Sequence, residues 1–214
     1  LLIWQPVLGA VICAETEGRA AQVDRAGYLM GPVFGCHLEQ PPEWAGALHA
    51  AAARSLDRCI TSIFDAVSQR VRLRRELARR QLADRVLGVL HRRAILGLAT
   101  VSATRLAAAK WLGALGLEGL SALEPMPLQD GSDGLWLCRR SCCLEYRARP
   151  DFLCTTCPRR AQPERIALTA KNGRLMFDLE NLSVARDGCE IRCIDDRRVG
   201  RVPVGMPVPV FSMR

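Results

Sequence analysis

A run of cysteines between Gly134 and Arg160 constrains this chain more than any other feature of its sequence. The run holds five of the ten cysteines in the 214-residue chain, and four of the five follow the pattern C-C-x10-C-x2-C. These four are Cys142, Cys143, Cys154 and Cys157. Four thiolates so close in sequence are typical of a metal site. The flanking arginines strengthen the interpretation, because positive charge favours the thiolate form that binds metals.

The spacing of the four cysteines favours an iron–sulfur cluster over a single zinc ion. A structural zinc site normally uses two C-x(2–4)-C pairs, and here Cys154 and Cys157 form one such pair. Cys142 and Cys143 are adjacent, so the backbone must turn to direct both side chains to one centre. A [2Fe–2S] cluster has two separated irons and is commonly held by four cysteine thiolates. Zinc is the alternative metal.

The cysteines lie within the run RRSCCLEYRARPDFLCTTCP, which spans Arg139 to Pro158. This run resembles the cluster-binding end of the FhuF-like ferric siderophore reductases. That family carries Arg-Arg-x-Cys-Cys-x-x-Tyr-Arg, then ten residues between the second and third cysteines, then C-x-x-C. The residues that match the accompanying positions are Arg139, Arg140, Tyr146 and Arg147.

The resemblance implies a [2Fe–2S] protein that reduces iron(III) held by a siderophore, with the four cysteines as ligands. Electron transfer of this kind requires no catalytic acid or base, and the sequence indicates none. Positive charge beside a cluster stabilises its reduced form and raises its potential. We therefore expect Arg140 and Arg147, together with Tyr146, to tune the cluster.

The rest of the sequence predicts a mainly α fold in three parts. Residues 1–124 are expected to form a helical body that begins inside a longer protein, because the first residue is Leu. Residues 134–160 form the cluster-binding segment, and residues 162–214 form a small β-rich tail. With 49% hydrophobic residues, the chain is not of the disordered class.

Apolar residues at three- and four-residue steps predict the helices of the body. A short apolar helix is expected within residues 1–14, and longer helices are expected over 43–71, 70–93 and 94–117. Residues 15–42 are rich in glycine and proline and are interpreted as a loop. Cys59 lies on the apolar stripe of its helix and is interpreted as a core residue.

Turn residues mark the boundaries of the second half of the chain. Residues 125–133 are interpreted as a linker. Asn172-Gly173 lies between two strand-like runs and predicts a hairpin. Cys138 is interpreted as a packing residue beside the cluster. Cys189 and Cys193 are too few to make a second metal site by themselves.

The net charge of +8 favours acidic or anionic partners. The arginines of residues 70–93 are expected to form a basic outer surface, with Asp84 as a partial neutraliser. The sequence has no G-x-G-x-x-G fingerprint for a nicotinamide or flavin. We therefore expect an acidic ferredoxin or a flavoprotein as electron donor, a cytoplasmic location and no nucleic acid. No transmembrane segment is expected, although the charge also suits contact with an anionic membrane surface.

Two other functions fit parts of the sequence. A basic helical chain with four cysteines is also typical of a nucleic-acid-binding regulator stabilised by zinc or an iron–sulfur cluster. The sequence shows neither a helix-turn-helix pattern nor zinc-finger spacing, which argues against that function. A structural zinc domain in a siderophore-assembly protein is a third alternative, and the cysteine pattern argues against it.

Overall fold

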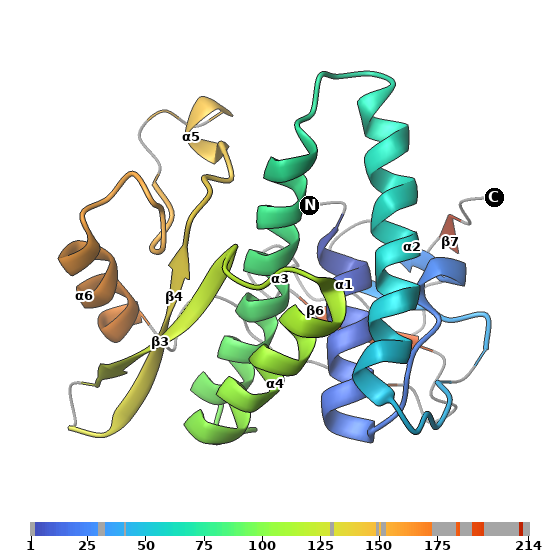
Figure 1. Ribbon diagram of the computed structural model, residues 1–214, viewed down its shortest axis with the longest axis horizontal. Helices are drawn as coiled ribbons and strands as arrows, with labels where there is room; N and C mark the ends of the chain where they lie inside the picture. Colours follow the sequence, from blue (N-terminus) through green and yellow to red (C-terminus); the bar gives the residue numbers. More distant parts are fainter. Residues whose placement is uncertain are drawn as a thin grey trace. The chain divides into compact units, whose positions relative to one another are not determined.

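The computed structural model describes residues 3–29, 33–40, 42–128, 131–148, 150, 153–172, 183–184, 190–194 and 210–211. The chain forms two compact units (Figure 1). The first comprises Leu1–Arg70 with Phe177–Arg214, and the second comprises Val71–Met176. The described chain is mainly helical and includes a small two-stranded sheet, as the predicted mainly α character required. None of its described helices is long and apolar enough to cross a membrane.

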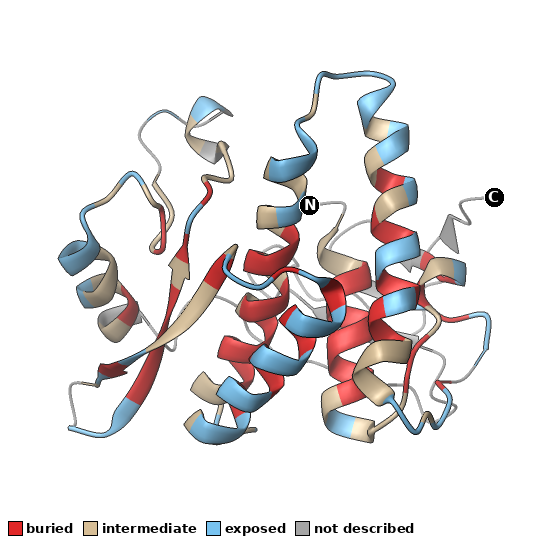
Figure 2. Cartoon of the chain, viewed as in Figure 1, coloured by how far each residue is buried: buried red, intermediate tan, exposed pale blue. Residues whose placement is uncertain are grey.

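The first unit contains the helices α1 (Trp4–Ile12) and α2 (Leu48–Ser68). The apolar helix predicted within residues 1–14 is confirmed by α1, which is buried from Pro6 to Ile12. Cys59 of α2 is buried, so its assignment to the core is also confirmed. Buried and exposed residues alternate along α2 (Figure 2).

Helix α2 begins five residues later than the sequence predicted. The backbone N–H and carbonyl of Glu43 both bond to Ala20, at 2.9 and 2.7 Å, so this residue is held in an extended pairing. Trp44 therefore lies outside the helix and is 77% exposed, and it does not belong to the apolar stripe.

A five-stranded antiparallel sheet occupies part of the region that the sequence analysis interpreted as a loop. Its order is β5-β6-β2-β1-β7. The strands are β1 (Gly27–Leu29), β2 (Val33–His37), β5 (Ser183–Val184), β6 (Glu190–Ile194) and β7 (Val210–Phe211). A π-helical turn (Cys13–Glu17) and a 3-10 turn (Val23–Arg25) precede it. The loop prediction for residues 15–42 was wrong in this respect, because the apolar runs there are too short to signal strands.

The described strands at the end of the chain place Cys193 in β6, opposite Phe34 of β2. Cys189 lies outside the described residues, as does most of the predicted β-rich tail beyond residue 172. The interpretation that Cys189 and Cys193 do not make a second metal site by themselves therefore stays a prediction.

Polar contacts connect the turns of the first unit to α2. Asp24 accepts hydrogen bonds from the Ser55 hydroxyl and, at 2.8 Å, from Nε of Arg58. Burial favours a higher pKa for Asp24, but Arg58 and Ser55 outweigh it and hold that pKa below its usual value. Glu15 and Nε2 of His49 form a second contact at 2.9 Å. These contacts hold the turns against α2.

The second unit is built on the helices α3 (Arg75–Ile95) and α4 (Val101–Leu115). Thr100 caps α4 by accepting a hydrogen bond from the N–H of Ala103 at 3.1 Å. Gly116 ends α4 in the left-handed conformation, with φ at 59°, which glycine adopts without steric cost. Residues 69–74 separate α2 from α3, so the expectation that the helix over 43–71 continues through 70–93 was wrong at this point, and the second helix begins only at Arg75.

A β-hairpin replaces the linker predicted for residues 125–133. Strands β3 (Ser121–Pro127) and β4 (Asp133–Arg139) pair in antiparallel register from Ser121↔Arg139 to Pro127↔Asp133. The linker prediction was wrong because Pro125 and Pro127 were taken as strand breakers. Proline is tolerated on an edge strand, whose outward N–H has no partner in any case. The hairpin packs on α3 and buries Trp136.

The hairpin predicted around Asn172-Gly173 is also wrong in its first strand. Residues Gln162–Asn172 form the helix α6. Pro163 and Glu164 lie in its first turn, where proline and an acidic side chain both favour a helix start. The following residues include good helix formers, and their spacing suits a helix with one packed face. Residues 173–182, which include the second strand predicted for this hairpin, lie outside the described part.

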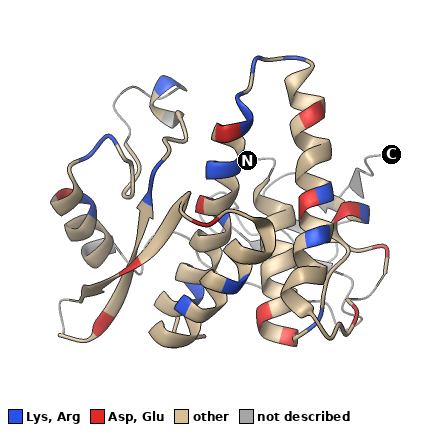
Figure 3. Ribbon diagram, viewed as in Figure 1, with Lys and Arg blue, Asp and Glu red and all other residues tan. Residues whose placement is uncertain are grey.

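The basic surface predicted for residues 70–93 is present at one end of that segment (Figure 3). The exposed arginines are Arg70, Arg72, Arg74, Arg75 and Arg79. Arg92 and Arg93, which were assigned to the same surface, are buried. The later part of α3 packs against α4 and the hairpin, so little of its circumference is left for solvent. Asp84 is buried too, so it does not neutralise an exposed face.

His91 makes the stability of the second unit dependent on pH. Its Nε2 donates to the carbonyl of Leu135 at 2.6 Å and joins α3 to β4. Burial lowers the pKa of His91 below 6.5, Leu135 opposes the shift and Arg92 adds to it. The unfolded chain therefore takes up this proton at a higher pH than the folded chain. The free energy of unfolding should fall as pH drops from about 6.5 through the lowered pKa.

This prediction is tested by urea denaturation at ~pH 5 and ~pH 8. His91→Gln retains an N–H donor for Leu135 but does not titrate, so we expect it to lose part of the pH dependence. Equal pH dependence in the two proteins would contradict the assignment to His91.

Candidate metal centre

The four cysteines lie in two segments that follow strand β4. Cys142 and Cys143 come directly after the end of β4 at Arg139, and the short helix α5 (Glu145–Ala148) follows them. Cys154 and Cys157 lie in the turns that precede α6. Cys157 is buried, with 1% of its surface exposed, and the other three are half-buried. None of the four is assigned to a disulfide bond in the described part of the chain.

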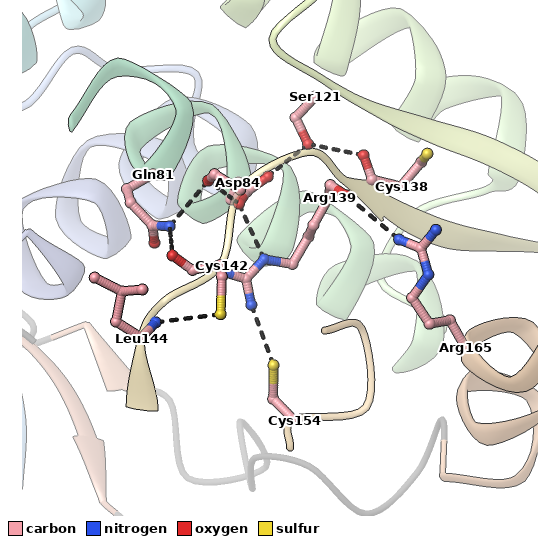
Figure 4. Close-up of polar contacts among 10 residues, drawn as sticks. Gln81, Asp84, Ser121, Cys138, Arg139, Cys142, Leu144, Cys154 and Arg165 are labelled. Carbon is pink, nitrogen blue, oxygen red and sulfur yellow. Dashed lines mark hydrogen bonds and ion pairs between the residues drawn. The ribbon is translucent and has the colours of Figure 1, made fainter. Parts of the chain in front are cut away.

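A backbone turn occurs at the adjacent pair, as the sequence required. Leu144 has φ at 64° and is the one non-glycine residue in the described chain with positive φ. Its N–H donates to Sγ of Cys142 at 3.4 Å (Figure 4). A leucine in the left-handed region carries a backbone strain of roughly 1–3 kcal/mol, which is often found at functional sites. The conformation reverses the chain beside Cys142 and Cys143.

Leu144→Pro is therefore expected to abolish metal binding. Proline fixes φ near −65° and removes the N–H that reaches Cys142. Leu144→Gly is the matched control, because glycine adopts positive φ without strain and retains the N–H. Metal per chain should be close to that of the unaltered protein in the glycine variant and near zero in the proline variant. Similar metal content in both would show that the turn is not needed.

The second pair lies in a turn that Arg160 fixes. The N–H of Cys157 donates to the carbonyl of Cys154 at 3.0 Å, which closes the C-x-x-C turn. Nη2 of Arg160 donates to the carbonyl of Leu153 at 2.9 Å, and its Nε donates to that of Cys154 at 3.3 Å. Arg160 also pairs with Glu164 of α6. The C-x-x-C turn is thereby anchored to the first turn of α6.

The thiols of the two segments lie close enough to shift one another's pKa. Burial raises the pKa of Cys142, the N–H of Leu144 lowers it, and Cys157 and Cys143 raise it further. Burial raises the pKa of Cys154 to about 12, assisted by Cys143 and Cys157 and opposed by Arg139. Cys157 thus acts on Cys142, and Cys143 acts on Cys154, so cysteines of the first segment lie near cysteines of the second.

The arrangement does not already form a single-ion site. Among the described residues, no three His, Cys, Asp or Glu side chains form a group that could hold a metal ion. Ligation of a metal would require the thiols to lose their protons.

A buried ion pair between Asp84 and Arg139 lies beside the start of the cysteine segment. Asp84 of α3 accepts from Nε of Arg139 at 2.9 Å, from the Ser121 hydroxyl at 2.7 Å and from the Ser141 hydroxyl at 3.2 Å. Gln81, one turn earlier on α3, donates to Oγ of Ser141 at 2.9 Å and to the carbonyl of Cys142 at 3.0 Å. Helix α3 thus holds both the end of β4 and the start of the cysteine segment (Figure 4).

Arg139 joins this network to the thiols. Its Nη1 donates to Sγ of Cys154 at 3.4 Å. Its Nη2 is buried and has no hydrogen-bond partner in the described part of the chain. Burial alone would lower the pKa of Arg139, but Asp84, Cys154 and Cys143 reverse the effect and raise it. The guanidinium therefore keeps its charge beside the cysteines.

The residues that the sequence analysis expected to tune the cluster occupy different places. Arg140 and Arg147 are exposed. Tyr146 is half-buried, and the guanidinium of Arg159 lies 4.2 Å from the centre of its ring. Their roles as tuning residues stay predictions.

Sequence reasoning missed Asp84, Gln81, Ser121, Ser141 and the role of Arg139. One signal was available, because Asp84 lies among the apolar positions of its helix rather than on the arginine face. Cys138 of β4 is half-buried, and burial and the neighbouring Glu124 raise its pKa. Its interpretation as a packing residue beside the cluster stays a prediction.

Comparison with protein-family models, with curated proteins and with solved structures finds no match. The resemblance to the siderophore reductases therefore stays a prediction that depends on the cysteine run.

Proposed function

We propose that the second unit binds a [2Fe–2S] cluster through Cys142, Cys143, Cys154 and Cys157. We further propose that the protein uses it to reduce iron(III) held by a siderophore. The observation that carries the proposal is that the two cysteine segments lie near each other, with Cys154 within hydrogen-bond distance of the buried guanidinium of Arg139. The run from Arg139 to Pro158, with its resemblance to the ferric siderophore reductases, supplies the reaction.

The residues present fit a two-iron group better than a single ion. Four cysteines, two of them adjacent, match the two irons, each of which takes two cysteine ligands. The free Nη2 of Arg139 provides a buried donor that suits a negatively charged group rich in sulfur. When bound, a [2Fe–2S] cluster supplies one-electron transfer.

The chain's own residues have three tasks in this function. The four cysteines hold the group as thiolates, and Leu144 and Arg160 fix the turns that carry them. Arg139 places positive charge against Cys154, while Asp84 fixes its position. Cys157 is buried, which keeps water from one side of the site.

The substrate explains why one electron is sufficient. A siderophore holds iron(III) through hard oxygen ligands, and iron(II) binds such ligands far less tightly. Transfer of one electron to the iron therefore releases iron(II) and leaves the chelator intact. The electron comes from a donor protein in the cytoplasm, for which an acidic ferredoxin or a flavoprotein suits the exposed arginines from Arg70 to Arg79.

The first test is the composition and spectrum of protein purified without oxygen. We expect two irons and two sulfides per chain, visible absorption that bleaches with dithionite, and an EPR signal of half-integer spin after reduction. Ferric hydroxamate and ferric catecholate chelates should then reoxidise the reduced protein, with iron(II) captured by a coloured chelator. Colourless protein with one zinc per chain would overturn the proposal. Reduced protein that no ferric chelate reoxidises would retain the cluster but refute the reaction.

A further inference from the structure

The three nitrogens of the Arg139 guanidinium have three different surroundings. Nε donates to Asp84 at 2.9 Å, Nη1 donates to Sγ of Cys154 at 3.4 Å, and Nη2 is buried without a partner in the described chain. The side chain is 8% exposed and that of Asp84 is 3% exposed. A buried guanidinium with one unused nitrogen, beside a cysteine sulfur, has a place for one more acceptor.

We infer that Arg139, held by Asp84, is the positioning residue that sets the reduction potential of the site. This inference builds on the proposed function and replaces Arg140 and Arg147 as the principal source of positive charge. It assigns to Arg139 a role that the sequence alone gave to its exposed neighbours. Asp84 acts through Arg139 by fixing where the guanidinium lies.

Burial is the physical reason that Arg139 outweighs Arg140 and Arg147. Charges in solvent are screened by water and salt, whereas charges in the interior interact in a medium of lower dielectric constant. Arg140 and Arg147 are exposed, so their effect on a nearby charge is small. Arg139 is fixed within hydrogen-bond distance of a ligand sulfur, and hydrogen bonds to sulfur raise the potential of iron–sulfur clusters.

The chemistry is a change of one electron with no bond to Arg139 made or broken. The donor protein loses one electron and the site gains one negative charge. Arg139 keeps its proton throughout, because a guanidinium is not deprotonated in proteins and this one is paired with Asp84 at 2.9 Å. A fixed positive charge stabilises the state with the extra electron, so the potential rises.

The first test compares Arg139→Gln with Arg140→Gln, which remove the same charge from adjacent positions. At one fixed ambient potential, we expect Arg139→Gln to lower the ratio of reduced to oxidised protein about tenfold, or ~59 mV for one electron. Arg140→Gln should change that ratio less than about twofold. Arg139→Lys should recover part of the lost potential, since lysine retains the positive charge but lacks the planar set of N–H donors of arginine. The ratios are read from EPR during a redox titration.

A second measurement needs no substitution at Arg139. Protein labelled with ¹⁵N in the arginine guanidinium groups should show nitrogen hyperfine coupling to the reduced site in pulsed EPR. The coupling should persist in Arg140→Gln and Arg147→Gln. It would support the inference even if the Arg139 variants failed to accumulate.

The outcomes separate the inference from the proposed function. Equal potentials in Arg139→Gln and Arg140→Gln would overturn the role of Arg139 while the cluster stands. Absence of guanidinium coupling in the labelled protein would have the same consequence. Zinc in place of iron in the unaltered protein would overturn the proposed function, and the inference with it.

Discussion

Replacing Asp84 with alanine is expected to lower the free energy of unfolding by about 3–5 kcal/mol. The carboxylate is buried and accepts hydrogen bonds from Arg139, Ser121 and Ser141. Its removal leaves the guanidinium of Arg139 buried without a counter-charge, and an uncompensated buried charge is among the most destabilising changes known. The two hydroxyl groups lose their acceptor as well.

Glu76→Ala is the matched control for Asp84→Ala. Glu76 lies on the same helix and pairs with Arg80 at 2.9 Å, but both side chains are largely exposed. Its loss should cost less than about 0.5 kcal/mol. Urea denaturation followed by circular dichroism measures both variants. Replacing Asp84 and Arg139 together by leucine should recover part of the loss, because no buried charge is then left unpaired. Equal losses in Asp84→Ala and Glu76→Ala would show that the ion pair is not a structural centre.

Substitution of one cysteine in either segment is expected to remove nearly all bound metal. Cys143→Ala removes one proposed ligand from the first segment, and Cys154→Ala removes one from the second. Loss of an outer-shell partner alone typically weakens metal binding 10–100-fold, so loss of a ligand should weaken it by more than about 100-fold. Iron and sulfide per chain, with the visible spectrum, give the result.

Cys138→Ala provides the control, because Cys138 lies four residues before the adjacent pair but in strand β4. We expect it to keep the full metal content. A loss in Cys138→Ala as large as that in Cys143→Ala would show that the ligand set was misassigned. Full metal content in Cys143→Ala would show the same.

Local sequence signals predicted those features that depend on near neighbours. The apolar run that became α1 and the buried stripe that contains Cys59 follow from helical periodicity. The adjacent pair required a turn, and Leu144 adopts one. The sequence thus indicated where a metal could bind and that the backbone must reverse there.

Contacts between distant residues could not be predicted in this way. Asp84 meets Arg139 across 55 residues, and helix periodicity alone cannot distinguish an acid facing a buried partner from one facing water. The segment that became α6 contains residues suited to either a strand or a helix, and the Asn-Gly pair favoured the wrong choice. Pro125 and Pro127 were similarly misleading, because they suit an edge strand as well as a linker.

The hydrogen bonds from Gln81 indicate that the metal is bound after the second unit has folded. The cysteine segment spans few residues, but Gln81 reaches Ser141 and Cys142 across 60 and 61 residues. Closing such loops carries an entropic cost that the ligands by themselves do not offset until α3 and the hairpin have met. Loading should therefore follow folding here, in contrast to zinc fingers, whose metal drives their folding. On the ribosome, the site would become competent to receive its metal after α6 has emerged, when Arg160 can anchor the second pair.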